Sequence, residues 1–219
     1  MLRATRAHIR KDFTVEFRSR FAVSVAAAFA AITTLSVSLA AGGAPLAPLV
    51  HAILYWIIVF FSAMSGLAHI FTREEEEGTS LLLRLVAPPE AVFTAKLVFN
   101  CAMLFALAVI ITPLYLFFLN VGLPGPGFLA LAASGTFAIA ASSTVLAAIV
   151  ARAGGKAALF TVISFPVLLP VLWICISTTS TILLGADADV AGSALFLLAF
   201  SGALVAVSYM LFEHIWSEE

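Results

Sequence analysis

The hydrophobic stretches of this 219-residue chain are almost free of charge. They contain no aspartate, glutamate or arginine, and we count Lys96, at the edge of the third stretch, with the polar segment before it. Ionisable groups inside a membrane usually mark ion or proton pathways. Their scarcity argues against a proton- or sodium-coupled transporter and against a charged selectivity ring. If the chain transports a substrate, the energy for transport must be supplied from outside this chain.

Cysteine clusters and nucleotide motifs are absent as well. The two cysteines, Cys101 and Cys175, lie in apolar runs without CxxC or zinc spacing, which favours buried small hydrophobes. No GxxxxGK[ST] motif and no nucleophile–base pair occurs, so the chain is not expected to be an enzyme or to hydrolyse ATP itself. His51 and His69, near opposite ends of the second stretch, are weak candidates for a haem or metal ligand; an interfacial polar role is favoured, and no cofactor is assigned.

Apolar residues dominate what is present. They make up 63% of the chain against 11% charged, a balance typical of a membrane protein. Stretches near the ~20 residues that cross a bilayer predict an all-α membrane protein with six spans. We place these at Phe21–Ala41, Leu49–Phe71, Val92–Leu119, Gly127–Ala151, Ala157–Leu184 and Val190–Phe212.

The positive charges are all on one side of this six-span arrangement. The turns AGGAPLAP, NVGLPGPG and GADAD contain no lysine or arginine, so all eleven cations fall on the other side. The positive-inside rule places that side and both termini in the cytoplasm. We therefore expect a multi-pass protein of the bacterial cytoplasmic (inner) membrane, with an outer face made of short turns. Phe21–Ala41 is long for a signal core and is read as a retained span.

The N-terminal segment 1–20 combines six cations with an apolar stripe. Ile9, Phe13 and Phe17 recur at four-residue spacing, which predicts an amphipathic helix lying along the membrane interface. The alternative is a basic tail that serves only as an orientation signal. The expected organisation is this helix at 1–20, a membrane domain at 21–212 that includes a cytoplasmic segment at 72–96, and a cytoplasmic tail at 213–219.

The polar segment between the second and third spans is the main interruption of the hydrophobic pattern. Glu74–Glu77 lead out of the membrane, and Gly78 can end a helix. Leu81–Ala87 predicts a short apolar helix, which Pro88-Pro89 ends. Pro89 suits the first turn of the next span. A short apolar helix exposed to water requires a partner, although a solvated charge run that only marks topology would also fit.

Prolines and small residues mark two spans further along the chain. Small residues recur at four-residue spacing in the fourth span, at Ala130, Ser134, Ala138 and Ser142, which favours close helix packing within the subunit. Kinks that could act as gates or hinges are predicted at Pro113 in the third span and at Pro166 and Pro170 in the fifth.

These features together resemble a known family. The segments that carry the resemblance are YWIIVFFSAMSGL (Tyr55–Leu67), FTREEEEGTSLLLRLVAPPEAVFTAKLVFN (Phe71–Asn100) and ISFPVLLPVL (Ile163–Leu172). The chain resembles the membrane subunits of ABC-2 type exporters and, more narrowly, the CcmB family of cytochrome c maturation, over essentially its whole length. The acidic-Gly-Thr segment followed by a proline turn is the most specific part.

The resemblance implies partners and a mechanism. Two such subunits would pair with two CcmA-type ATPase subunits and associate with CcmC- and CcmD-type membrane proteins and the haem chaperone CcmE, with haem as a cargo of the complex. The role implied is either haem export or ATP-driven release of haem-loaded chaperone, and the resemblance favours release. No nucleic-acid partner is expected. Coupling to the ATPase would fall on the segment between the second and third spans, at Arg73, Glu76, Glu77, Gly78, Thr79, Leu82, Arg84 and Pro88.

The sequence also fits two other functions. An ABC-2 permease for another amphipathic substrate, such as a lipid, a glycan carrier or a drug, needs the same architecture. A non-transporting scaffold that only holds a partner would need the polar segment for assembly alone. ATPase turnover that depends on Leu82 would separate a coupled permease from a scaffold.

Overall fold

The computed structural model describes residues 2–76, 88–122, 124–152 and 157–217. These residues form helices joined by short turns, and six of the helices are long and apolar enough to cross a membrane. The all-α architecture with six spans is therefore confirmed. The helices are α1 (Leu2–Ser19), α2 (Phe21–Ala41), α3 (Pro48–Glu76), α5 (Pro89–Phe118), α6 (Pro126–Arg152), α7 (Ala157–Leu183) and α8 (Val190–Ser217).

The helix boundaries follow the sequence pattern closely. Helix α2 has the predicted limits, and it ends because Gly42 adopts the left-handed conformation (φ 56°), its N–H bonding the Leu39 and Ser38 carbonyls. Helix α5 begins, as predicted, with Pro89 in its first turn. Two helices continue five residues beyond the predicted spans: α3 reaches Glu76 instead of Phe71, since glutamate sustains a helix well, and α8 reaches Ser217 instead of Phe212.

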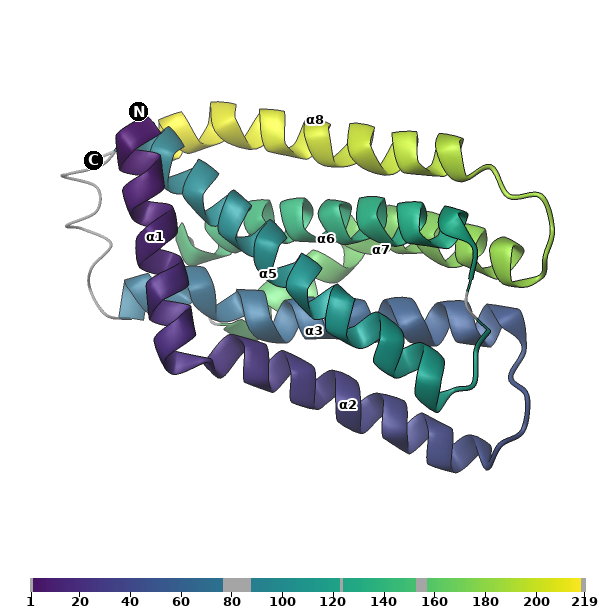
Figure 1. Cartoon of the computed structure of the whole chain (residues 1–219). Helices are drawn as coiled ribbons and strands as arrows, with labels where there is room; N and C mark the ends of the chain where they lie inside the picture. The colour runs from purple at the N-terminus through teal and green to yellow at the C-terminus, as the bar shows by residue number, and fades with distance from the viewer. Residues whose placement is uncertain (1, 77–87, 123, 153–156, 218–219) are drawn as a thin grey trace.

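The two ends of the helix bundle differ in what they carry (Figure 1). Helix α1 and the start of α5 lie at one end, together with the end of α8, and we call this the basic end. The connections after α2, α5 and α7 lie at the opposite end, which we call the turn end. The turns there contain no lysine or arginine. The charge separation predicted from the sequence is thus a separation between the two ends of the bundle.

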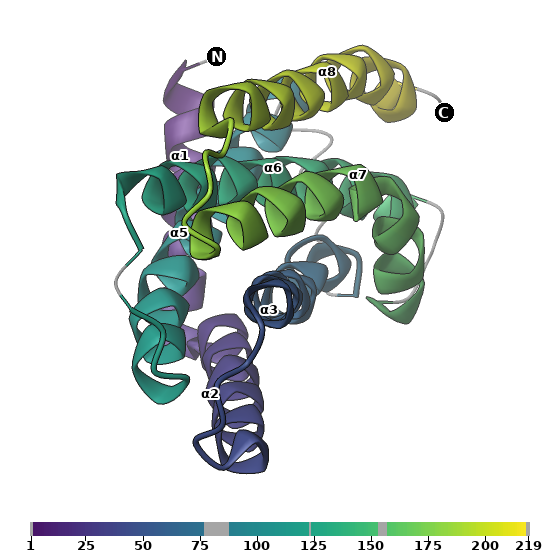
Figure 2. The ribbon, with the colours of Figure 1, turned by 90° about the vertical axis from the view of Figure 1, so that its right-hand side faces the viewer.

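Helix α6 is the centre of the bundle. It packs against α3, α5, α7 and α8 (Figure 2), and 83% of an eighteen-residue apolar window within Pro126–Val150 is buried, against 11% of the corresponding window in α8. Its small residues make this possible, because Ser134, Ala138 and Ser142 are buried while Ala130 is exposed. The predicted small-residue packing within the subunit is confirmed at three of the four positions.

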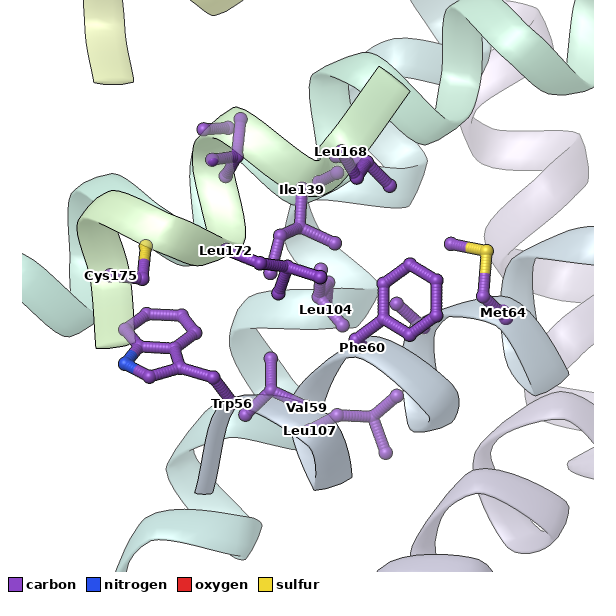
Figure 3. Close-up of a cluster of buried hydrophobic side chains, with 14 of the residues drawn as sticks. Trp56, Val59, Phe60, Met64, Leu104, Leu107, Ile139, Leu168, Leu172 and Cys175 are labelled. Carbon is purple, nitrogen blue, oxygen red and sulfur yellow. The ribbon is translucent and has the colours of Figure 1, made fainter. Parts of the chain in front are cut away.

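The core contains one especially close junction, between α3, α6 and α7 (Figure 3). The Trp56 indole lies beside Cys175, and its Nε1–H donates to Thr179 Oγ1 at 2.8 Å. A Cβ atom at Gly135 would overlap the Trp56 ring and approach Cys175 Sγ to 2.7 Å. Glycine at this position therefore lets a fully buried tryptophan lie directly against α6.

One sequence expectation is wrong at the start of α5. Lys96 was counted with the polar segment, but it lies two turns inside α5 and is only 2% exposed. The helix begins at Pro89, and α1 packs against α5. The lysine is therefore enclosed by protein, although it closely follows the polar segment in the sequence. The third span therefore contains a lysine.

Helix α1 lies across the basic end, transverse to the spans, and contacts α5 (Figure 1). The Phe13 ring meets Phe99 edge-to-face with centroids 4.9 Å apart. The corner into α2 is formed by Arg20 in the left-handed conformation (φ 51°), and Glu16 accepts a hydrogen bond from the Val23 N–H at 3.2 Å. The apolar stripe of α1 is therefore used in part against the bundle, and its position at a membrane interface stays a prediction.

Candidate functional site

The predicted coupling segment is described only at its two flanks. Arg73 and Glu76 lie in the last turns of α3, but their side chains are outside the part of the chain that the structure describes. Pro88 is exposed and precedes α5 in an extended conformation (φ −65°, ψ 139°). Its carbonyl accepts hydrogen bonds from the Ala91 and Val92 N–H groups at 3.0 and 3.4 Å. Outside the described residues lie Glu77, Gly78, Thr79, Leu82 and Arg84, and with them the predicted short helix.

The first turns of α5, which directly follow this segment, are held by helices on two sides. Phe99 contacts Phe13 of α1, and Phe93 contacts Tyr209 of α8 edge-to-face at 5.1 Å. Thr94 Oγ1 donates to the Glu90 carbonyl at 2.6 Å, so the Tyr209 hydroxyl donates to Thr94 Oγ1, also at 2.6 Å. The beginning of α5 therefore cannot shift without α1 and α8.

Further along α5, hydrogen bonds connect it to its neighbours. Asn100 Nδ2 donates to Thr144 Oγ1 of α6 at 2.8 Å, fully buried. Nearer the turn end, Thr112 Oγ1 donates to the Ala108 carbonyl, and the Tyr55 hydroxyl of α3 in turn donates to Thr112 at 2.9 Å. Buried polar pairs of this kind fix the relative position of helices in an apolar environment. They bond α5 to α6 and, nearer the turn end, to α3.

The three prolines proposed as hinges all lie within continuous helices. Pro113 is in α5, and Pro166 and Pro170 are in α7. All three are exposed on the surface of the bundle. Each proline lacks an N–H and displaces the carbonyl four residues before it, which weakens the helix locally. Figure 2 shows that the axis of α7 bends. A hinge role for these positions stays a prediction.

Helix α7 differs between its two halves. Pro166 lies in the half toward the basic end and Pro170 at the middle of the helix, and the buried Ser164 hydroxyl near Pro166 has no hydrogen-bond partner among the described residues. The half toward the turn end is bonded to two other helices: Thr179 accepts from Trp56 of α3, and Thr178 pairs with Ser193 of α8 at 2.8 Å. Bending of α7 would therefore be concentrated in its proline-containing half.

His51 is held at the turn end by Tyr115. The Tyr115 hydroxyl donates to the His51 carbonyl at 3.0 Å and lies 3.2 Å from Nδ1. Because the hydroxyl has one proton, Nδ1 carries the hydrogen of the second bond, and Nε2 keeps a lone pair. His51 also lines a cavity of about 200 Å³ with Ser38 and Asn120, between the turns after α2 and α5.

No metal-ligand cluster surrounds this histidine in the described part of the chain. Among the described residues, no group of three His, Cys, Asp or Glu side chains is placed to hold a metal ion. His69 lies on the same helix, eighteen positions away, which is roughly 27 Å along the axis; its side chain is outside the described part. The two weak candidates are therefore not brought together.

Several residues that connect the helices were missed by sequence reasoning. Tyr209 and Thr94 are 115 positions apart, and Trp56 and Thr179 are 123 apart. No local pattern pairs such residues. Gly135 lay in the small-residue region of the fourth span, which was a usable signal, but the sequence does not show that a tryptophan would pack against it.

A comparison with protein families gives a match. The model of a protein family described as "CcmB protein" matches residues 3–214, nearly the whole chain. No curated protein matches the chain.

Proposed function

The chain belongs to the CcmB family, and on that premise we propose that it is the permease subunit of an ABC-type complex in cytochrome c maturation. It is a multi-pass membrane protein with six apolar spans. The observation that carries the proposal is the family match over residues 3–214, which includes the segment between α3 and α5. In the proposed complex, ATP is hydrolysed by a separate CcmA-type subunit, since this sequence has no phosphate-binding loop.

The contacts of α5 support a coupling role for the segment before it. Pro88 leads into α5 without a linker, and the first turns of α5 are packed against α1 and α8. A displacement imposed on the segment by an ATPase would therefore move α5 together with these two helices. The buried bond between Asn100 and Thr144 would carry the same displacement to α6 at the centre of the bundle. Packed helices transmit movement because their interiors resist compression.

We further propose that the work done is release of haem-loaded CcmE-type chaperone from the complex rather than passage of haem through this chain. A release role requires no haem ligand in the chain, and the sequence carries no convincing haem-binding pattern. The other proposed members of the complex are CcmC- and CcmD-type membrane proteins and a second copy of this chain, in the bacterial inner membrane with both termini in the cytoplasm.

Co-purification tests this composition. The tagged chain is extracted from native membranes in a mild detergent, and the proteins that accompany it are identified by mass spectrometry. An ATPase together with CcmC-, CcmD- and CcmE-like proteins is the expected result. An ATPase without the haem proteins would favour an exporter of another amphipathic substrate, and no ATPase in intact complexes would refute the coupling role.

A substitution in the segment tests coupling itself. Leu82→Asp places a charge on the short helix predicted to enter the ATPase, and we expect loss of the ATPase stimulation that the wild-type chain gives. Leu184→Asp is a matched control, because Leu184 is an exposed leucine at the opposite, turn end of the bundle. If Leu82→Asp leaves stimulation unchanged while the complex assembles, the segment does not couple.

A further inference from the structure

Helix α1 presents a surface that the proposed function does not use. One stripe of it contains Arg6, Arg10 and Phe17, which follow one another at spacings of four and seven residues and so share one side of the helix. All three side chains are exposed, and Phe17 is 73% exposed although it is a large aromatic. Phe13, four residues before it, is half-buried: it meets Phe99 edge-to-face and stacks on Phe17 with ring centroids 6.1 Å apart. A phenylalanine that stays largely exposed, in line with two arginines, fits a partner that is both anionic and apolar.

The charges of α1 are separated around the helix. Its two acidic residues, Asp12 and Glu16, are half-buried, and Glu16 bonds the Val23 N–H at the corner with α2. The exposed side is basic, with Arg18 adding to Arg6 and Arg10, and Arg20 is exposed at the corner itself. The acidic groups are therefore directed toward the bundle, and the outward side has a positive field that attracts anions.

The direction of α1 limits which partner fits. The helix lies across the basic end, transverse to the six spans (Figure 1). The side of α1 that faces away from the bundle therefore runs parallel to the membrane surface at this end. A helix in this plane with arginines and an aromatic on one exposed side matches the phosphate groups and the glycerol region of a lipid leaflet. A soluble anion would satisfy the arginines but leave Phe17 in water.

We propose that the stripe Arg6–Arg10–Phe17 binds anionic phospholipid in the leaflet at the basic end, with the guanidinium groups on lipid phosphates and the Phe17 ring in the interfacial layer. Arginine suits this role because its planar fork bonds phosphate oxygens in pairs. The binding depends on neither haem nor an ATPase, so it can fail or succeed separately from the proposed function.

The test measures lipid contact at α1 in the full chain. Thr14, exposed on α1 four residues after Arg10, is replaced by cysteine and labelled with a fluorophore after reconstitution into bilayers. The chain without this substitution, labelled in the same way, gives the background from Cys101 and Cys175, which are half-buried and buried. Quenching by brominated phosphatidylglycerol is compared with quenching by brominated phosphatidylcholine in otherwise identical bilayers.

We expect the wild-type stripe to favour phosphatidylglycerol, and Arg6→Gln/Arg10→Gln to reduce the preference by about fivefold for each arginine. Arg6→Lys/Arg10→Lys keeps the charge and should retain most of the preference. Raising the ionic strength toward 1 M, where the Debye length is about 3 Å, should abolish it. Phe17→Ser should weaken quenching by both lipids alike.

An unchanged lipid preference in the double glutamine variant would overturn the proposal. If that variant also loses a protein that co-purifies with the wild-type chain, the stripe is a protein interface instead. Equal helicity and a monodisperse profile in size-exclusion chromatography establish that the compared variants are folded.

Discussion

Gly135→Ala is a sharp test of the junction between α3, α6 and α7. The added Cβ would overlap the Trp56 ring and lie 2.7 Å from Cys175 Sγ, closer than van der Waals contact allows. Trp56 is fully buried and bonded to Thr179, so it cannot rotate away without losing that hydrogen bond. The substitution therefore forces helices apart instead of filling space.

The expected cost is the balance of two effects. Overpacking a well-filled core costs about 1–3 kcal/mol, whereas replacing a helical glycine by alanine gains up to about 1 kcal/mol from helix propensity. We expect a net loss of about 1–2 kcal/mol in the free energy of unfolding. Gly202→Ala on α8 is the matched control, because a Cβ there has nothing within 4 Å; it should be neutral or slightly stabilising.

The assay is reversible unfolding in mixed micelles, followed by circular dichroism as the denaturing detergent fraction rises. Trp56→Phe removes the outer ring atoms nearest to Gly135, so Gly135→Ala should cost less in that background, with the contact to Cys175 remaining. A double-mutant cycle measures the difference. If Gly135→Ala costs nothing, or costs the same with phenylalanine at position 56, the account of this junction is wrong.

Two further predictions concern the start of α5. Phe13→Ala removes the edge-to-face contact with Phe99, worth about 0.5–1.5 kcal/mol beyond the area lost, and should raise amide hydrogen exchange in α1 while α6 stays protected. In a Phe99→Ala background the same change should raise exchange much less, and an undiminished effect would contradict the contact. Tyr209→Phe removes the bond donated to Thr94 and should cost about 1 kcal/mol of stability; in a Thr94→Val background the same change should cost much less, and an undiminished cost would refute the pairing.

Sequence alone determined most of the architecture. Each span is a run of about twenty apolar residues, and in a bilayer the backbone must satisfy its own hydrogen bonds, so such a run has to be a helix. The limits of α2 and the first turn of α5 followed from Gly42 and Pro89, which act on their immediate neighbours. The separation of cations from the turns could be counted directly.

The positions of the coupling residues could also be proposed from the sequence, through the resemblance. Helix α3 continues to Glu76, five residues beyond the predicted end of the second span, and α5 begins at Pro89, three residues before the predicted start of the third. Five of the eight predicted coupling residues lie outside the described part of the chain. Their role rests on the family match and on the experiment with Leu82.

Only the tertiary structure decided which apolar side chains meet. Lipid and protein are equally apolar, so hydropathy cannot distinguish a side chain facing a neighbouring helix from one facing the membrane. This is why hydropathy did not identify α6 as the central helix, although its small residues indicated close packing, and why Lys96 was found enclosed. It is also why Phe13 and Phe17, equivalent in the pattern, have different environments: Phe99 of α5 contacts the first, whereas the second stays 73% exposed.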